Sequence, residues 1–278
     1  RKRTMKNEKT YELVLTALFT AIIVIMAFTP LGYIPLVVIN ATVIHIPVIL
    51  GALFLGPKKG AFLGFVFGLT SFINNTFKAV TASAFVFSPV LAANVVGMSG
   101  VFKSMYICFV PRILVGIIPY FVYILIRNLL KSEQKVWRVV INAVVSFVLF
   151  ISIRAFVSNL IEKGNGALTG TLSGAVVGII LFIVLTITAH KKASSSVALA
   201  YAGLTGAFTN TLFVMSGIYI LYKDAYAQAL GIAGDTVIDV IMGIISFNGI
   251  VEAVVAAILI AGIGLALMQV KPIKGLKE

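Results

Sequence analysis

The stretch from Tyr11 to Phe28 reads YELVLTALFTAIIVIMAF and contains one charged residue, Glu12. An α-helix rises 1.5 Å per residue, so about 20 mostly apolar residues cross a hydrocarbon core of about 30 Å. Similar stretches recur along the 278 residues, of which 60% are hydrophobic and 11% charged, with a mean hydropathy of +1.10. A soluble domain carries about 25% charged residues. The composition excludes a soluble globular protein and predicts an all-α integral membrane protein.

Seven further stretches have the composition of membrane spans, and turns such as Gly56-Pro57-Lys58-Lys59-Gly60 separate them. The stretch from Asn74 to Lys103 is apolar but irregular, which predicts a structured outer loop, because irregular backbone at membrane depth must be buried in protein or line a cavity. We expect one membrane domain over residues 1–278. The eight predicted spans are Tyr11–Phe28, Asn40–Leu55, Ala61–Ile73, Ser104–Leu130, Val139–Ile161, Ala167–Ala189, Val197–Tyr222 and Val240–Gln269.

The distribution of Lys and Arg predicts the orientation of these spans. With the N-terminus inside, 16 of the 22 Lys and Arg residues fall on the inner side, beginning with the five between Arg1 and Lys9. Loops on the cytoplasmic side of membrane proteins carry an excess of Lys and Arg. The net charge of +13 therefore indicates both termini in the cytoplasm, and not a nucleic-acid partner.

Polar side chains gather in the outer halves of several predicted spans, whereas the inner halves are almost wholly aliphatic. His45, for example, stands 13 residues before the inner Lys58, which is roughly 20 Å along a helix. Polar groups inside a membrane are costly and are usually satisfied by one another or by a ligand. The candidate binding residues of this layer are Asn40, Thr42, His45, Asn75, Lys78, Ser88, Arg112, Asn210, Asn248 and Glu252.

Two interpretations of this polar layer stay open at this point. The layer can form an outward-facing pocket for a small polar solute, with Arg112 or Lys78 pairing a carboxylate. Alternatively, single residues reach the interface or form interhelical hydrogen bonds. Glu252 can balance Arg112 or carry protons, and Arg154 can reach outward. The number of spans that converge favours the pocket.

Small residues recur every fourth position in three places: Gly60, Gly64 and Gly68; Gly166, Gly170, Gly174 and Gly178; and Ala17 with Ala21. Such stripes let helix backbones approach closely. For the glycine stripes we expect packing inside the bundle, and not a subunit interface. Spacing alone does not decide the role of the alanine pair.

Several classes of activity have no counterpart in the sequence. There is no Gly-x-x-x-x-Gly-Lys-Ser/Thr phosphate loop and no His-Glu-x-x-His motif, and Cys108 is the only cysteine. We found no arrangement of catalytic groups typical of a membrane protease or transferase. The sequence predicts a protein that is not an enzyme and that holds no metal or cofactor.

Six motifs, in order and spacing, resemble the substrate-binding (S) components of energy-coupling factor (ECF) vitamin transporters, most of all the pantothenate type. They are LTALFTA (15–21), FTPLGYIP (28–35), INATVIHIP (39–47), LGPKKGAFLG (55–64), PRILVG (111–116) and LTGAFTNT (204–211). The resemblance covers about residues 11–130 and 197–270. That family has six membrane helices, so residues from about 139 to 190 look like an inserted helical hairpin.

The resemblance implies a prokaryotic plasma-membrane protein that captures a vitamin outside the cell. Such a subunit docks on a transmembrane scaffold (T) component driven by two cytoplasmic ATPase (A) subunits, and is thought to topple in the membrane to release the vitamin. The family's scaffold contact on the first helix would fall here on Ala17 and Ala21. The family's pocket is built by outer loops and the outer ends of later helices, where the polar layer lies.

The sequence thus predicts a subunit that binds a vitamin, with pantothenate expected from the resemblance. Two alternatives remain. A proton-coupled secondary carrier of a small polar or anionic solute would use Glu252, Asp239 and Arg154, although the two halves show no clear repeat. An S component for another vitamin, such as niacin, a thiamine precursor or a queuosine precursor, would share the fold.

Overall fold

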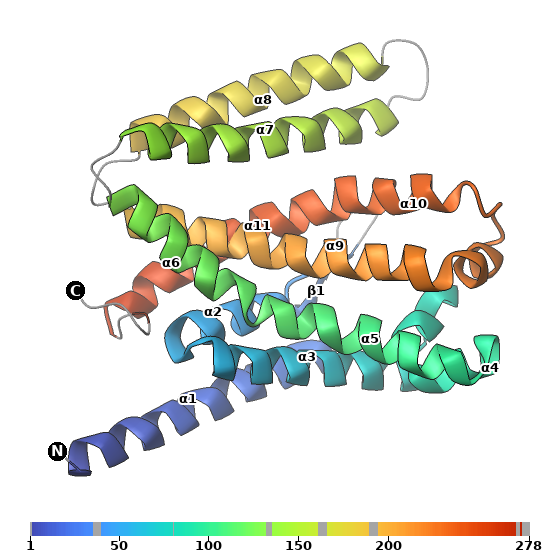
Figure 1. Cartoon of the computed structure of the whole chain (residues 1–278), viewed down its shortest axis with the longest axis horizontal. Helices are drawn as coiled ribbons and strands as arrows, with labels where there is room; N and C mark the ends of the chain where they lie inside the picture. Colours follow the sequence, from blue (N-terminus) through green and yellow to red (C-terminus); the bar gives the residue numbers. More distant parts are fainter. Residues whose placement is uncertain are drawn as a thin grey trace.

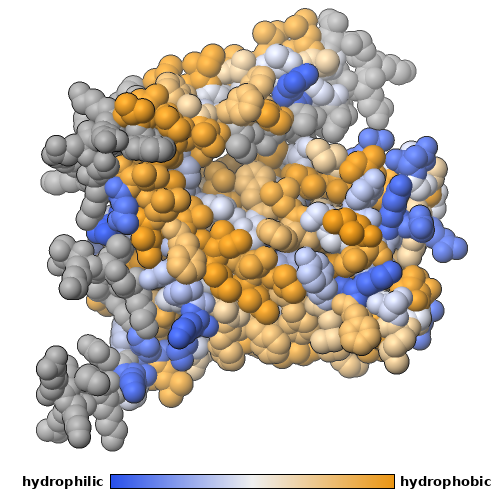
Figure 2. Space-filling view, viewed as in Figure 1, coloured by the Kyte–Doolittle hydropathy of each residue, from blue (hydrophilic) through white to orange (hydrophobic). Residues whose placement is uncertain are grey.

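The computed structural model describes residues 2–35, 40–79, 81–131, 135–160, 166–188, 194–270 and 273. In this part of the chain nearly every residue is helical, and one small sheet joins the first two helices (Figure 1). Figure 2 shows an apolar belt across the middle of the molecule, with hydrophilic residues gathered at its two ends. This distribution fits the predicted all-α membrane protein.

The chain begins with a long helix and a short β-hairpin, which precede the buried helix α2 (His45–Leu55). Helix α1 (Lys2–Phe28) ends just before Pro30, because a proline disfavours helical backbone at the preceding residue. A 3₁₀ turn, η1 (Pro30–Gly32), leads into strand β1 (Tyr33–Pro35), which pairs antiparallel with β2 (Asn40–Thr42). The predicted span Asn40–Leu55 was therefore wrong at its start, since its first three residues are extended.

Helix α2 (His45–Leu55) lies at the centre of the molecule, and all of its residues are buried. Eleven residues span about 17 Å, which is too short to cross the membrane alone. Gly56 has a φ of 88°, a left-handed conformation that glycine adopts without steric cost, and turns the chain directly into α3 (Pro57–Phe77).

The predicted outer loop is a structured cap. It consists of a 3₁₀ turn, η2 (Ala82–Phe87), a short helix, α4 (Pro89–Val96), and the beginning of α5 (Met98–Val115). Helix α6 (Ile118–Lys131) continues the direction of α5 after a break at Gly116. The predicted span Ser104–Leu130 thus comprises two helices.

The second half contains a helical hairpin and three core segments. The hairpin of α7 (Lys135–Leu160) and α8 (Gly166–Thr188) lies at the edge of the molecule opposite α1 (Figure 1). Helix α9 (Ser194–Leu230) is followed by α10 (Val237–Ile244), a π-helical turn, η4 (Ile245–Gly249), and α11 (Ile250–Met268). The Tyr201 hydroxyl on α9 donates to the Ile141 carbonyl on α7 at 3.0 Å and ties the hairpin to the core.

Five helices of the described residues are long and apolar enough to cross a membrane, fewer than the eight spans predicted. They are Lys9–Phe28, Pro57–Phe77, Met98–Leu130, Ser195–Leu230 and Ile250–Met268, with shorter apolar helices at His45–Leu55 and Gly166–Ile180. The other three predicted spans are not among the five: Asn40–Leu55 begins with β2 and leaves the short helix α2, and the described parts of Val139–Ile161 and Ala167–Ala189 give no helix of this kind. The predicted span Val240–Gln269 also joined part of α10 to α11.

The described glycines of both stripes pack inside the molecule, as predicted. A Cβ on Gly64 would collide with the Arg112 carbonyl oxygen, and one on Gly60 with the Gly116 carbonyl oxygen, so α3 packs directly on α5 and the turn after it. On α8, a Cβ at Gly174 would come within 2.7 Å of the Phe150 carbonyl oxygen on α7. These stripes are closed by the chain itself.

Candidate functional site

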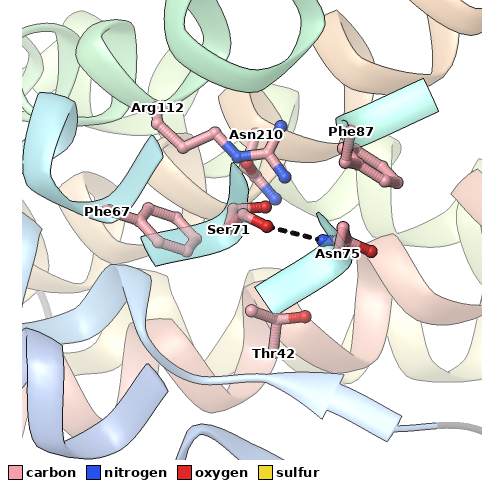
Figure 3. Close-up of a pocket in the computed structure, with 7 residues that line it drawn as sticks. All are labelled: Thr42, Phe67, Ser71, Asn75, Phe87, Arg112 and Asn210. Atoms are coloured by element: carbon pink, nitrogen blue, oxygen red, sulfur yellow. Dashed lines mark hydrogen bonds between the residues drawn. The ribbon is translucent and has the colours of Figure 1, made fainter. Parts of the chain in front are cut away.

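A cavity of about 190 Å³ opens among five elements, β2, α3, η2, α5 and α9 (Figure 3). Its lining residues are Thr42, Phe67, Ser71, Asn75, Phe87, Arg112 and Asn210. Four of these, Thr42, Asn75, Arg112 and Asn210, belong to the predicted polar layer. Residues far apart in the sequence therefore meet at one site, as the pocket interpretation requires.

One face of α3 forms a wall of the cavity. Phe67, Ser71 and Asn75 follow one another at four-residue intervals, so their side chains lie along one side of the helix. The Asn75 amide donates to the Ser71 backbone carbonyl at 2.8 Å, which fixes the amide group at the wall (Figure 3).

Arg112 is the cationic group of the cavity, and 6% of its surface is exposed. Its guanidinium lies 5.6 Å from the ring centre of Phe67 and 5.1 Å from that of Phe87. Aromatic faces attract cations, and desolvation strengthens the attraction. One guanidinium nitrogen also donates to the Ile107 carbonyl at 2.7 Å. These contacts hold a buried positive charge at the wall, where an anionic group of a ligand would be attracted.

Glu252, at the start of α11, is buried beside this cavity. Its carboxylate accepts from the Thr42 backbone N–H at 2.8 Å and from the Thr211 hydroxyl at 3.3 Å. Arg112 is near enough to interact with it electrostatically. Glu252 therefore joins β2, α9 and α11 through hydrogen bonds within the chain.

Other buried polar atoms near this level have no hydrogen-bond partner among the described residues. They are both ring nitrogens of His45, Oδ1 of Asn210 and Oδ1 of Asn248. A Cβ on Gly206 of α9 would contact Ile49 of α2. His45 lies one turn before Ile49, and Asn210 lies one turn after Gly206, on two helices that run in opposite directions. His45 and Asn210 therefore occupy the same depth. An unsatisfied buried polar group is unfavourable, so these atoms favour a polar ligand.

The remaining predicted residues lie outside the cavity lining. Lys78 is exposed, with its ammonium 6.0 Å from the centre of the Phe28 ring. Ser88 is buried, accepts from the Leu91 backbone N–H as the N-cap of α4, and bonds to the Thr76 hydroxyl at 2.7 Å. The side chain of Asn40 falls outside the described part of the structure. Ser88 thus has structural partners of its own.

Three lining residues, Phe67, Ser71 and Phe87, were not predicted. The four-residue spacing that ends at Asn75 was a signal for Phe67 and Ser71. Phe87 belongs to η2, where no helical period runs, and its place over Arg112 depends on the tertiary fold.

A buried hydrogen-bond network holds η2 in place beside the cavity. The Tyr222 hydroxyl on α9 donates to the Gly100 carbonyl at 2.6 Å and bonds to the Ser104 hydroxyl at 2.7 Å. Ser104 in turn donates to the Phe85 carbonyl at 2.9 Å. The network links α5 and α9 to the turn that carries Phe87.

We expect Tyr222→Phe to destabilise this cap. The change leaves the Gly100 carbonyl and the Ser104 hydroxyl without their common partner, at a cost of about 1–3 kcal/mol. Thermal unfolding in detergent checks it, with Tyr219→Phe, whose ring contacts Lys223 at 5.6 Å, as the control. Equal unfolding temperatures of the two variants would show that the network contributes no stability.

Comparison with known proteins identifies the family. The model of the family described as ECF transporter, substrate-specific component, matches residues 11–161, more than half of the chain. The chain is 42% identical over 137 residues to the pantothenic acid transporter PanT of Lactococcus lactis subsp. cremoris, a match that covers 46% of the chain and 65% of that relative, slightly under two thirds. It is 26% identical over 280 residues to the pantothenate transporter PanT of Leuconostoc mesenteroides subsp. mesenteroides, covering 98% of the chain and 100% of that relative. The resemblance in the motifs is confirmed: the chain belongs to the family of substrate-specific components of ECF transporters, which are transporter subunits and not enzymes.

Proposed function

We propose that the chain captures pantothenate outside the cell for import by an ECF transporter. The observation that carries the proposal is the buried Arg112 guanidinium in a cavity lined by two side-chain amides, in a chain similar to two proteins named for pantothenate transport. Pantothenate carries one carboxylate, one amide and two hydroxyls. Arg112 would pair the carboxylate, and Asn75 and Asn210 would bond to the amide and hydroxyls.

The other residues of the predicted polar layer have secondary roles in this proposal. His45 and Asn248 offer buried polar atoms near the depth of the cavity, and Thr42 contributes to its wall. Lys78 and Asn40 would lie at the outer entrance without contacting the bound ligand, and Ser88 would hold the cap.

Competition binding with matched compounds tests the assignment. Panthenol differs from pantothenate by a hydroxymethyl group in place of the carboxylate, so it isolates the contribution of Arg112. We expect unlabelled pantothenate to displace labelled pantothenate, and panthenol to do so at least about thirtyfold less well, as for the loss of a buried charge pair. Niacin and thiamine should not compete. Equal displacement by panthenol would remove the carboxylate from the recognition.

The partners in this proposal are a T component and two ATPase subunits. An apolar groove on the exposed side of α1 is the candidate contact with the T component. It is lined by Leu13, Thr16, Ala17, Thr20, Ala21, Val24, Ile25 and Phe62, and both alanines are exposed. Small residues let another helix approach closely.

We expect Ala17→Leu with Ala21→Leu to abolish uptake while leaving vitamin binding intact. Two added side chains would fill the groove, and the cavity is formed by other elements. Cellular uptake of labelled pantothenate and titration of the purified variant measure the two properties. Ala167→Leu, at an exposed position of α8, is the matched control. Uptake at the normal rate in the double variant would exclude this face as the docking surface.

In the membrane, we propose a six-helix S-component bundle with the α7–α8 hairpin inserted, giving about eight spans, in a prokaryotic plasma membrane with both termini cytoplasmic. A membrane-impermeant maleimide should then label Lys78→Cys in whole cells, but Lys58→Cys only after lysis. The native Cys108 is buried and gives little background. The reverse labelling would invert the topology.

The proton-coupled carrier has less support. Arg154 and Asp239 are exposed, and the Glu252 carboxylate is bonded within the chain. Uptake by the chain alone, driven by a pH gradient in liposomes, would favour that carrier.

A further inference from the structure

Glu252 is a buried carboxylate beside the cavity, but it is absent from the cavity lining. Its two oxygens accept from different parts of the chain, Oε1 from the Thr42 backbone N–H at 2.8 Å and Oε2 from the Thr211 hydroxyl at 3.3 Å. We call this pair of bonds the Glu252 bridge. It connects the end of β2 to α9, which are 169 residues apart in the sequence.

The bridge acts on a residue that does line the cavity. Thr42 is the last residue of β2, paired opposite Tyr33 at the open end of the two-stranded sheet. A two-stranded hairpin is only marginally stable alone, so an anchor to the helices is needed to fix its end. The Glu252 carboxyl oxygen that accepts from the Thr42 N–H at 2.8 Å supplies that anchor.

Charge argues against a direct contact between Glu252 and an anionic ligand. Arg112 is the cation of the cavity, and a ligand carboxylate beside it would be repelled by a second carboxylate in direct contact. Both oxygens of Glu252 accept hydrogen bonds from Thr42 and Thr211 instead, so the carboxyl group does not face the ligand and this repulsion does not arise.

We infer that Glu252 is a positioning residue for substrate recognition, which sets the place of Thr42 in the cavity wall through the Glu252 bridge. The inference rests on the proposed function only for the identity of the ligand. The bridge consists of hydrogen bonds within the chain, so one arm of the test needs no ligand.

The first arm is amide hydrogen exchange of the purified, ligand-free chain, followed in peptides covering residues 40–46. In Glu252→Ala the Thr42 amide loses its acceptor, and we expect its exchange to accelerate by about tenfold to a hundredfold, as for the loss of a buried hydrogen bond. Thr211→Val should give a smaller acceleration, and Glu252→Gln, which keeps an acceptor oxygen, a partial one. Thr209→Val is the matched control, because the Thr209 hydroxyl donates to the Thr205 carbonyl of its own helix.

The second arm is a double-mutant cycle on pantothenate affinity with Glu252→Ala and Thr42→Val. If Glu252 acts through Thr42, the loss of affinity in Glu252→Ala should shrink when the Thr42 hydroxyl is already absent.

Additive losses, or a loss of affinity with unchanged exchange at residues 40–46, would show that Glu252 contacts the ligand itself and would overturn the inference. Acceleration of exchange throughout α5 and α9 in Glu252→Gln would assign a general structural role instead. Failure of the wild-type chain to bind pantothenate would refute the proposed function, while the exchange arm would still decide the bridge.

Discussion

Arg112→Ala should weaken pantothenate binding by about thirtyfold or more. The variant removes the cavity's cation and leaves a ligand carboxylate buried without a partner, at a cost of about 2–5 kcal/mol. Arg112→Lys should restore little, because an ammonium cannot stack between the Phe67 and Phe87 rings as the planar guanidinium does. Isothermal titration of the purified variants measures the effect.

Lys78→Ala is the matched control for the loss of Arg112, because it removes an exposed cation near the outer end of α3. Its affinity should stay within about threefold of the unmodified chain, since exposed charge pairs contribute little. If Lys78→Ala lost affinity and Arg112→Ala kept it, the carboxylate would bind at the entrance and the assignment of the cavity would be wrong.

Gly64→Leu should unfold or severely destabilise the chain. A Cβ at this position already collides with the Arg112 backbone carbonyl, and a leucine side chain has no space between α3 and α5. Overpacking a closed contact costs about 1–3 kcal/mol and sometimes more. The displaced backbone belongs to Arg112, so any folded fraction should also bind the vitamin weakly. Thermal unfolding in detergent and the yield of monodisperse protein check the prediction.

Gly262→Leu provides the comparison on α11. Nothing lies within 4 Å of a Cβ at this exposed glycine, so its substitution should leave the unfolding temperature unchanged or slightly raised. Equal destabilisation by both substitutions would indicate a general intolerance of larger residues, and not a close contact between α3 and α5.

The sequence was informative where one chemical pattern decided the structure. Apolar runs predicted the membrane helices, four-residue glycine spacing predicted close packing, and the depth of polar residues predicted Thr42, Asn75, Arg112 and Asn210 at one site. Each of these signals assumes helical geometry, although Thr42 reaches the site from strand β2.

The errors arose where tertiary contacts decide the structure. The strand at Asn40–Thr42 pairs with β1, so α2 begins only after it and ends before Gly56. Phe87 reaches Arg112 from a 3₁₀ turn without helical periodicity. Ser88 and Glu252 were predicted to bind the substrate, but neither lines the cavity, and their hydrogen bonds connect segments of the chain, which no sequence pattern specifies.

The central claim is that this chain alone recognises pantothenate, and the most direct test is isothermal titration of the purified chain with pantothenate, without ATP or partner subunits. We predict saturable binding of one pantothenate per chain, with no heat from niacin or thiamine under the same conditions. Absence of binding to pantothenate, or saturable binding of niacin or thiamine in its place, would contradict the account.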